Sequence, residues 1–269
     1  MGLYSGKWAM ITGASSGIGK AYAERFAKEG ANLILIARGQ QALEDLAQSI
    51  RTQAGVEVLV LPKDLSLQNS PQEIFNELKD KNIHVEILVN NAGFAVYGKL
   101  HEANLARNQE QLMLNVVGLS SLTQLFIKPM VENGKSGTVI NVASTAGFQP
   151  LPYMANYGAS KAFVRQFTEA LWAEYRHEGI QVLAVCPGST ETNFFNIVNA
   201  KEASVGKRDT PENVVEESLR ALKCGKMYVI TGPLNNFLLS QLSRLVTHKF
   251  VTRITEKVMR PQLKGSQSA

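Results

Sequence analysis

The sequence has few cysteines, no long hydrophobic run and little net charge outside its C-terminal end. Its two cysteines, Cys186 and Cys224, form neither a metal-ligand spacing nor a disulfide framework, which is typical of a reducing compartment. No run approaches the roughly 18 apolar residues of a membrane span. The first residues, "MGLYSGKWAMITG", lack the hydrophobic region and the small-residue cleavage site of a signal peptide. We therefore expect a cytoplasmic protein.

The net charge of +5 comes from the end of the chain. Residues 1–234 hold 22 basic and 22 acidic side chains, whereas residues 235–269 hold six basic side chains and one acid, Glu256. This local excess argues against a general surface for nucleic acid. The four histidines are scattered without metal-ligand spacing, so no metal site is predicted.

Short apolar runs alternate with segments of helical periodicity along the whole chain. The runs expected to be strands buried on both faces are "WAMIT" (8–12), "NLILIA" (32–37), "VEVLVL" (56–61), "VEILVN" (85–90), "GTVINV" (137–142) and "GIQVLAVC" (179–186), with "KMYVITGP" (226–233) as a last edge strand. This alternation predicts an α/β fold, a doubly wound parallel sheet with helices on both faces, in a single domain over residues 1–269. Ligands of such sheets bind beyond the carboxyl ends of the strands.

The first predicted strand leads directly into "TGASSGIG" (12–19), and a helical pattern follows. Glycines at 13, 17 and 19 permit a tight turn and let a pyrophosphate approach the amide groups at a helix N-terminus. The motif predicts a dinucleotide site formed by Gly13, Ser15, Ser16, Gly17, Ile18 and Gly19. Its spacing, G-x-x-x-G-x-G, differs from the commonest dinucleotide fingerprint, G-x-G-x-x-G.

Arg38 follows the second predicted strand, where proteins that bind NAD usually carry an acid. A guanidinium group can bind the 2′-phosphate of NADP through two parallel hydrogen bonds, and no acid is present to repel that phosphate. A solvated arginine is the alternative interpretation. We expect NADP(H) as the cofactor.

The stretch "NYGASKAF" (156–163) places Tyr157 four residues before Lys161. On a helix the two side chains would share one face, roughly 5–6 Å apart at Cβ. A nearby ammonium group stabilises a phenolate and lowers the pKa of the phenol. The same spacing is common on solvated helix faces, so the pair has meaning only beside other motifs.

Further motifs occur in order: "NNAG" (90–93), Asn115 in "LMLNVVG", Ser144 in "NVAS" and "PGST" (187–190). With "TGASSGIG" and "YGASK" they resemble the short-chain dehydrogenase/reductase family, and the motifs span residues 12–192. The resemblance implies a Rossmann-type fold and a catalytic tetrad of Asn115, Ser144, Tyr157 and Lys161. It also implies contacts with the cofactor from Asp64, Leu65, Asn91, Ala92, Gly93, Tyr157, Lys161, Pro187, Gly188, Thr190 and Thr192.

The same resemblance implies roles in the reduction of a carbonyl group. Tyr157 would donate the proton, Lys161 would lower the pKa of the phenol and bind the nicotinamide ribose, and Ser144 would position the carbonyl. Asn115 would help to hold a water that relays protons. A cofactor-sensing NADP-binding protein without turnover is the alternative, and the intact tetrad argues against it. A nucleotide-sugar epimerase fits less well, because such relatives have a different glycine spacing and a larger substrate domain.

The substrate is expected to be a hydrophobic ketone, because the predicted substrate loop, 193–210, is apolar. It contains Phe194, Phe195, Ile197 and Val198. The helical segment that follows Asn156 presents Phe163, Phe167 and Leu171 beyond the needs of a core. Family members pair this helix across a two-fold axis, so a homodimer or homotetramer is expected.

The segment 234–262 is predicted to be a lid-like helical extension at the substrate site. At i+4 spacing it carries an apolar stripe, Leu238, Leu242, Val246, Phe250, Ile254 and Val258. A cationic stripe, Lys249, Arg253 and Lys257, lies about 100° away around the helix. A lid over the substrate cleft is the favoured interpretation, and association with an anionic membrane surface or contact with another subunit are the alternatives.

Overall fold

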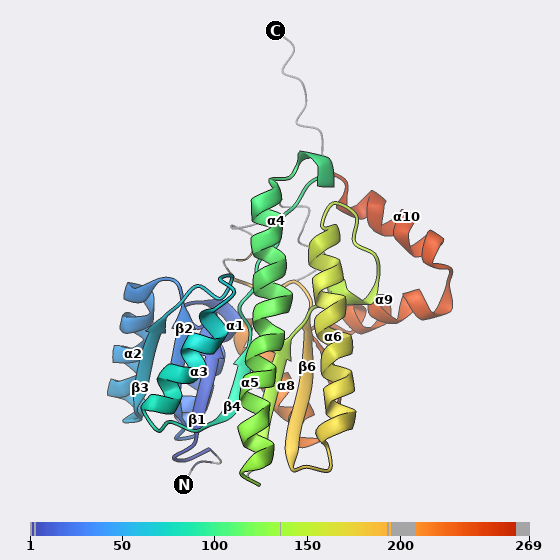
Figure 1. Cartoon of the computed structure of the whole chain (residues 1–269). Helices are drawn as coiled ribbons and strands as arrows, with labels where there is room; N and C mark the ends of the chain where they lie inside the picture. Colours follow the sequence, from blue (N-terminus) through green and yellow to red (C-terminus); the bar gives the residue numbers. More distant parts are fainter. Residues whose placement is uncertain (1, 3, 135, 193, 195–207, 262–269) are drawn as a thin grey trace.

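A seven-stranded parallel sheet forms the centre of the molecule (Figure 1). The structure is a computed structural model that describes residues 2, 4–134, 136–192, 194 and 208–261. The strands are β1 (Trp8–Thr12), β2 (Asn32–Ala37), β3 (Val58–Pro62), β4 (Val85–Asn90), β5 (Gly137–Val142), β6 (Ile180–Pro187) and β7 (Tyr228–Thr231). Their order is β3-β2-β1-β4-β5-β6-β7, and all neighbours are parallel. The predicted strands, including the edge strand β7, are confirmed.

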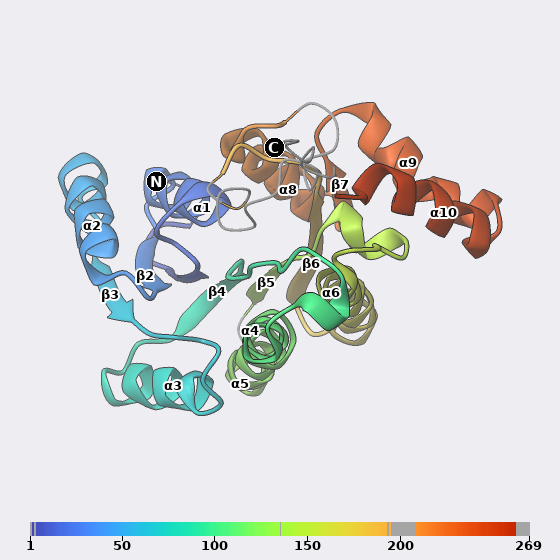
Figure 2. The ribbon, with the colours of Figure 1, turned by 90° about the horizontal axis from the view of Figure 1, so that it is seen from above.

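Helices cover both faces of the sheet (Figure 2). One face carries α1 (Gly17–Lys28), α2 (Gln40–Ala54) and α8 (Pro211–Lys223), and the other carries α3 (Ser70–Asp80), α5 (Leu119–Glu132) and α6 (Ala155–Tyr175). Beyond the carboxyl ends of the strands lie α4 (Leu105–Leu112), α9 (Leu234–Leu245) and α10 (His248–Met259), with the short 3₁₀ helices η1 (Leu100–Glu102) and η3 (Thr145–Phe148). The predicted doubly wound Rossmann-type fold is confirmed.

Successive residues of the strands are buried in two different hydrophobic clusters. In β2, Leu33 and Leu35 pack in the cluster with Tyr22 and Phe26 of α1. Ile34 and Ile36 pack on the opposite face, with side chains of α3 and α5. The apolar runs of the sequence are therefore continuous, because a parallel sheet with helices on both sides buries every strand position.

A continuous helical segment, Leu105–Glu132, is 28 residues long and apolar enough, by length and composition, to cross a membrane. Its apolar side chains Leu122, Phe126 and Ile127 are buried against the sheet, and this core packing explains the composition. The middle of the segment is a π-helix, η2 (Met113–Gly118), which contains Asn115. A Cβ atom at Gly118 would lie 2.7 Å from the Leu65 carbonyl oxygen, so glycine permits this helix to approach the loop after β3.

The C-terminal extension differs from the single helix that the sequence predicts. The chain leaves α9 after Leu245 and begins α10 at His248, where the Thr247 hydroxyl accepts a hydrogen bond from the Phe250 amide. The predicted stripe from Leu238 to Val258 is therefore wrong as a single helix face. Most of the predicted substrate loop, including Phe195, Ile197 and Val198, lies outside the described residues.

Candidate active site

The glycine-rich loop after β1 has the backbone geometry that its sequence predicts. Gly13 and Gly17 have φ values of +65° and +54°, in the left-handed region that favours glycine. A Cβ atom at Gly13 would lie 2.8 Å from the Asn91 side-chain nitrogen, and one at Gly19 would clash with the Gly13 carbonyl. The loop therefore admits no side chains at these positions, and its backbone is open to a close ligand.

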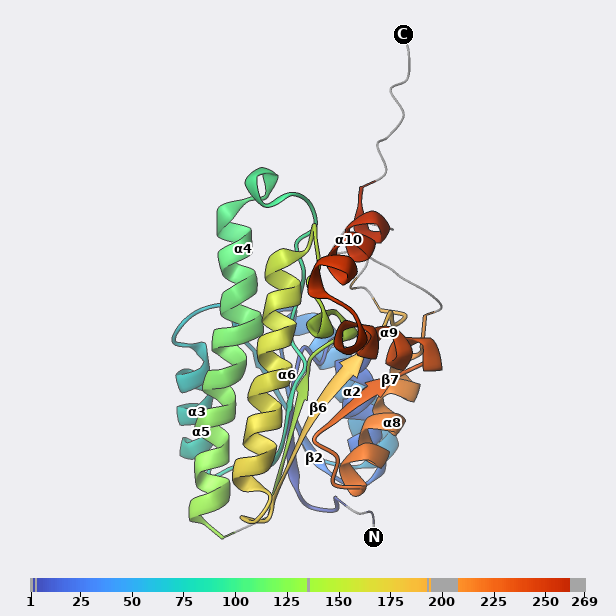
Figure 3. The ribbon, with the colours of Figure 1, turned by 90° about the vertical axis from the view of Figure 1, so that its right-hand side faces the viewer.

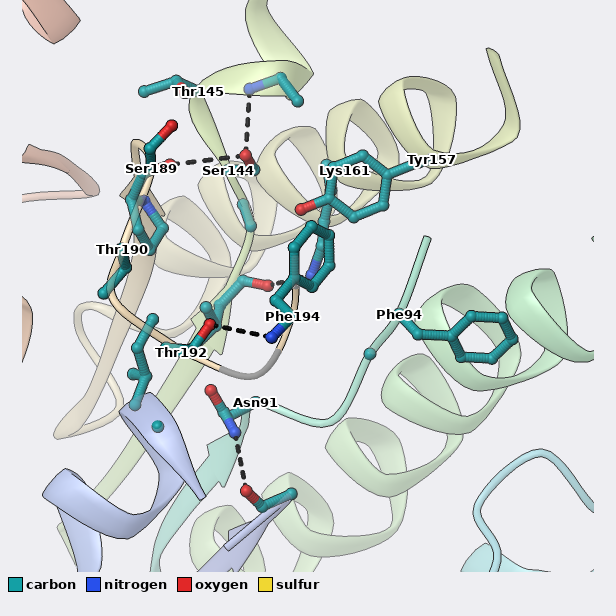
Figure 4. Close-up of a pocket in the computed structure, with 18 of the residues that line it drawn as sticks. Asn91, Phe94, Ser144, Thr145, Tyr157, Lys161, Ser189, Thr190, Thr192 and Phe194 are labelled. Carbon is teal, nitrogen blue, oxygen red and sulfur yellow. Dashed lines mark hydrogen bonds between the residues drawn. The ribbon is translucent and has the colours of Figure 1, made fainter. Parts of the chain in front are cut away.

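The loop after β1 is fastened to the loop after β4. The Thr12 hydroxyl accepts hydrogen bonds from the amides of Asn91 (2.9 Å) and Ala92 (3.0 Å). The Asn91 side chain in turn donates to the Thr12 carbonyl at 3.0 Å (Figure 4). Because α1 begins at Gly17, next to this junction, the positive end of its dipole lies where an anion would be favoured.

A cavity of about 770 Å³ runs along the carboxyl edge of the sheet. The predicted site residues that line it are Gly13, Ser15, Ser16, Gly17, Ile18, Arg38, Asp64, Leu65, Asn91, Ala92, Gly93, Ser144, Tyr157, Lys161, Pro187, Gly188, Thr190 and Thr192. Gly19 and Asn115 do not line it, since Gly19 packs beneath the Gly13 carbonyl. The fold thus brings residues from the ends of six strands, β1 to β6, into one cavity.

Cationic side chains gather where the cavity passes the ends of β2 and β3. Arg38 is largely exposed, and its guanidinium lies 3.2 Å from a carboxylate oxygen of Glu110, which also pairs with Arg107. Burial opposes the ionisation of Asp64, but hydrogen bonds from Ser66 and the charges of Arg38 and Arg107 lower its pKa. Lys63 and Arg107 line the cavity as well, and sequence reasoning missed both. Lys63 could have been found from its place between the third strand and Asp64.

Ser144, Tyr157 and Lys161 lie together at the other end of the cavity (Figure 4). Tyr157 and Lys161 come from the first two turns of α6, and Ser144 caps η3 directly after β5. The Tyr157 hydroxyl points toward Ser144. The Ser144 hydroxyl donates to the Pro187 carbonyl at 3.4 Å and accepts from the Ala146 amide at 3.1 Å. These bonds hold Ser144 beside the carboxyl end of β6.

The pKa of the Tyr157 phenol is raised, not lowered as the Tyr-x-x-x-Lys pattern predicts. Burial raises this pKa to about 12, and the hydrogen bond with Ser144 opposes the rise. The Lys161 ammonium lies 5.9 Å from the Tyr157 ring centroid and donates to the Val142 carbonyl at 2.7 Å. Burial lowers the pKa of Lys161 to about 8. Desolvation by burial is therefore the largest cause of both pKa shifts.

Asn115 is buried behind the cavity and does not reach it. Its side-chain oxygen accepts from the Phe94 amide at 3.2 Å, while its nitrogen donates to the Phe94 carbonyl (3.0 Å) and the Ser160 hydroxyl (3.2 Å). A Cβ atom at Gly93 would lie 3.0 Å from the Asn115 oxygen and 3.5 Å from the Lys161 nitrogen. The Asn115 side chain therefore fixes the backbone beside Lys161 and has its hydrogen bonds within the protein.

Apolar side chains dominate the end of the cavity beyond Tyr157. Leu151, Met154, Val251 and Met259 line it, and the ring of Phe194 lies 5.4 Å from that of Tyr157 (Figure 4). Polar groups there are few. They include Gln149, whose side-chain oxygen is buried without a hydrogen-bond partner in the described part of the chain. No motif marks Gln149 or Met154, although both lie between Ser144 and Tyr157 in the sequence.

Two tyrosines hold α10 over this apolar end. The Tyr97 hydroxyl donates to the Met259 carbonyl at 2.7 Å, and the Tyr153 hydroxyl lies 3.2 Å from a carboxylate oxygen of Glu256. Tyr153 has a φ of +63°, which is rare for an aromatic residue and costs backbone strain. Its carbonyl accepts from the Gly98 amide at 2.8 Å. These contacts make α10 part of the cavity wall.

Together, the glycine loop at one end of the cavity and the serine, tyrosine and lysine at the other define an α/β dinucleotide-binding protein with an oxidoreductase site. Within the described residues no group of three or more histidines, cysteines and acids could hold a metal ion. The family model for short chain dehydrogenases matches residues 7–203. The chain belongs to the short-chain dehydrogenase/reductase family, whose members are oxidoreductases that act on carbonyl and alcohol groups.

The chain is similar to proteins with different substrates. It is 32% identical to 17-beta-hydroxysteroid dehydrogenase type 3 of Mus musculus over 82% of this chain and 72% of the relative. A short-chain dehydrogenase from Sphingobium yanoikuyae, solved in complex with NADPH, is 29% identical with a TM-score of 0.79 over 98% of this chain and 99% of that one. A bulky-bulky ketone specific alcohol dehydrogenase from Comamonas testosteroni is 28% identical with a TM-score of 0.74 over 98% and 97%.

Proposed function

We propose that the protein is an NADPH-dependent carbonyl reductase that converts a hydrophobic ketone to an alcohol. The observation that carries this proposal is the cavity, in which the Gly13 loop and the pair of Ser144 and Tyr157 line one continuous space of about 770 Å³. Such a volume holds a ligand of dinucleotide or drug size in the range common for binding sites. This arrangement supports a dinucleotide site and a proton donor within one cavity.

The residues present fit a nicotinamide dinucleotide. The glycine loop offers a backbone cradle that a Cβ atom at Gly13 or Gly19 would fill, at the positive end of the α1 dipole. Asp64 and Leu65 would hold the adenine ring, the segment 91–93 the adjoining ribose side, and Pro187–Thr192 the nicotinamide. When bound, the reduced cofactor supplies the hydride.

Ser144 and Tyr157 would act on the carbonyl oxygen of the substrate. Hydride addition leaves negative charge on that oxygen, so a donor aimed at it and a proton are both needed. With a pKa raised to about 12, the Tyr157 phenol is protonated at neutral pH and ready to donate. Lys161, with a pKa lowered to about 8, is still mostly charged and would stabilise the phenolate left behind.

Two features support NADPH as the cofactor. Arg38 follows β2 in a turn, Ala37–Gly39, that contains no acid, and Lys63 and Arg107 add positive charge to the same part of the cavity. The relative from Sphingobium yanoikuyae was solved with NADPH. Arg38 and Arg107 share one acid, Glu110, and Lys63 pairs with Glu73 at 3.0 Å. The exposed Arg38 guanidinium can still exchange its acid for a phosphate, which it binds better than a hydroxyl group.

Support for a hydrophobic ketone comes from the apolar wall beyond Tyr157. Leu151, Met154 and Phe194 face this end, and it holds few groups able to bind a charged substrate. Two of the similar proteins are named for a hydroxysteroid and for bulky ketones.

A panel of carbonyl compounds tests the proposal, with NADPH oxidation followed by absorbance and NADH as a control. We expect turnover of apolar ketones, and a Tyr157→Phe variant should lose roughly 10²- to 10⁴-fold in kcat while binding NADPH with unchanged Kd. Tyr175→Phe, at the other end of α6, is the matched control. Turnover confined to small charged keto acids would refute the ketone assignment, and NADPH binding with no turnover of any compound would favour a sensor.

A further inference from the structure

The two C-terminal helices expose an unusual amount of apolar surface. On α9, Leu234, Phe237 and Leu238 are 72%, 46% and 56% exposed, and on α10, Phe250, Ile254 and Val258 are 51%, 40% and 51% exposed. Nearly half of the large apolar side chains that are exposed in the described residues lie in this stretch of 25 residues. Exposed apolar groups gathered in this way mark a surface that contacts another phase or molecule.

The same surface is rich in unpaired cations. Lys249, Arg253 and Lys257 of α10 are exposed and have no ion pair with any described residue. The acid of this segment, Glu256, is paired with Arg260 at 2.6 Å. Three of the basic residues that give the end of the chain its excess charge are therefore presented beside the exposed apolar side chains.

The apolar, cationic and cavity-lining side chains of α10 lie in three adjacent sectors around the helix axis. At roughly 100° per residue, with Phe250 at 0°, the exposed apolar residues Ile254 and Val258 lie at roughly 40° and 80°. The cations lie at roughly 260–340°, on one side of that stripe. The side chains of Val251, Thr255 and Met259, at roughly 100–180°, line the cavity on its other side. The exposed apolar stripe thus lies between the cavity wall and the cations, and α10 lies at the right-hand edge of the molecule in Figure 1.

We propose that the exposed surface of α9 and α10 docks on an anionic lipid bilayer, with the apolar stripe in the interface and the cations on the headgroups. An apolar face flanked by lysine and arginine is the pattern of helices that lie in a membrane surface. Each basic residue near an anionic leaflet adds to the attraction.

A second copy of the chain fits this surface less well than a bilayer does. In a two-fold dimer the same patch faces itself, so the partner patch offers Lys249, Arg253 and Lys257 further cations and one acid, Glu256, which is already paired. Such a partner leaves the three charges without neutralisation, whereas anionic headgroups neutralise them.

Docking would place the cavity mouth at the bilayer, because Ile254 and Val258 belong both to the exposed stripe and to the cavity lining. Docking itself does not depend on the identity of the substrate. Entry of an apolar ketone from the lipid phase follows from it and rests on the proposed function.

Co-sedimentation of the full chain with vesicles tests the proposal. Vesicles of phosphatidylcholine alone are compared with vesicles that also contain phosphatidylserine, at low and high salt. We expect binding to the anionic vesicles that salt weakens. The triple variant Lys249→Gln, Arg253→Gln, Lys257→Gln should bind roughly a hundredfold more weakly. The pair Leu238→Ser and Phe250→Ser should also weaken binding.

The triple variant Arg220→Gln, Lys223→Gln, Lys226→Gln is the matched control, since it removes equal charge from exposed positions at the amino edge of the sheet. It should bind like the parent, and thermal melting by circular dichroism checks that all variants fold. Equal binding to neutral and anionic vesicles, equal loss in both triple variants, or no binding would overturn the proposal. Self-association that Phe250→Ser abolishes, without vesicle binding, would assign the surface to a second copy instead.

Discussion

Arg38 is the residue that we propose determines the specificity for NADP over NAD. Its ion pair with Glu110 is largely exposed, and such pairs contribute little to stability, so the guanidinium is available to a phosphate. An Arg38→Asp variant should repel the 2′-phosphate and accept hydrogen bonds from the 2′-hydroxyl of NAD. We expect the ratio of kcat/KM for NADPH over NADH to fall by roughly tenfold to a hundredfold.

The Arg38→Lys variant provides the graded control for this measurement. It keeps the charge and loses the two parallel hydrogen bonds. Its preference for NADPH over NADH should therefore lie between those of the parent and of the Arg38→Asp variant. If the parent enzyme used NADH as well as NADPH, or if Arg38→Asp still preferred NADPH, the assignment of Arg38 would be wrong.

Lys161 gives the protein a stability that depends on pH. Burial lowers its pKa from 10.5 to about 8, so between these values the unfolded chain binds a proton that the folded chain does not. The free energy of unfolding should therefore rise with pH across this window, by about 3 kcal/mol in total from this group.

Urea unfolding from pH 7 to 10.5 measures this effect, with a Lys161→Met variant as the reference. The difference between the parent and the variant isolates Lys161, because tyrosine ionisation affects both proteins similarly. The parent should gain stability relative to the variant as the pH rises. A constant difference across the window would show that the ammonium is not desolvated in the folded protein.

At the scale of elements, the sequence predicts the strands better than the end of the chain. The runs from Trp8 to Pro187 are apolar at successive positions because helices bury both faces of the sheet, and this pattern needs no knowledge of the fold. The i+4 spacing from Leu238 to Val258 continues across Val246 and Thr247, where the chain leaves one helix and starts another. Spacing alone cannot reveal a break that keeps the same register.

The sequence likewise predicts only part of the candidate site. Motif residues such as Gly13 and Tyr157 are close to their partners in sequence or carry a recognisable spacing. Lys63, Arg107 and Gln149 enter the cavity from three separate elements, and only the fold brings them there. The desolvation that sets the pKa of Tyr157 is likewise a property of packing, which a local sequence pattern does not contain.

Removal of α9 and α10 should separate cofactor binding from substrate binding. Both helices line the cavity, α10 with apolar side chains and α9 with Asn235, Asn236 and Ser240, whereas the glycine loop and Arg38 are held by β1 and β2. Truncation after Pro233 should leave NADPH binding nearly intact and raise KM strongly. Asn236 packs over Gly188, so a modest loss of NADPH affinity from a looser nicotinamide segment is also expected.

Fluorescence titration with NADPH and steady-state kinetics check this prediction. Truncation after Pro261, which keeps both helices, is the control and should leave KM unchanged. An unchanged KM after truncation at Pro233 would show that α10 is no part of the substrate wall.

At the scale of the whole molecule, a buried chain of polar side chains ties two helices to the sheet. The Asn90 amide of β4 donates to Thr123 of α5 (3.0 Å) and to Asn141 of β5 (2.9 Å). Asn141 in turn donates to Thr168 of α6 at 3.0 Å. Since α6 also carries Tyr157, this chain fixes the catalytic helix on the strands.

An Asn141→Leu variant should destabilise the fold, because the buried Asn90 amide and the buried Thr168 hydroxyl each lose one hydrogen bond and keep only those to Thr123 and Val164. We expect a loss of about 2–3 kcal/mol in the free energy of unfolding, measured with urea. Gln72→Ala removes an exposed amide that bonds Asn76 on α3 and should change stability by less than about 0.5 kcal/mol. Equal effects of the two substitutions would show that the buried chain carries no special stabilisation.

The outer surface of the helical layer that includes α4, α5 and α6 has the apolar side chains expected of a subunit contact. Phe163 of α6 is 40% exposed and stacks on Phe167, with ring centroids 5.5 Å apart. Leu112 and Val117 are exposed on the neighbouring helical segment, at 38% and 40%. In Figure 1, α4 and α5 form one continuous helical column and α6 runs beside it, and in Figure 3, α10 lies on the side of α6 away from that column. A contact through α6 would therefore leave the α10 surface free.

We predict that the protein forms a homodimer or homotetramer through this layer. A Phe163→Glu variant would bury two unpaired carboxylates near the two-fold axis, which costs several kcal/mol, so the assembly should dissociate. Analytical ultracentrifugation compares it with the parent and with Leu67→Glu, a change at a 62% exposed position in the loop between β3 and α3. Only Phe163→Glu should sediment as a smaller species. An unchanged sedimentation coefficient in that variant would place the subunit contact elsewhere or show that the parent is monomeric.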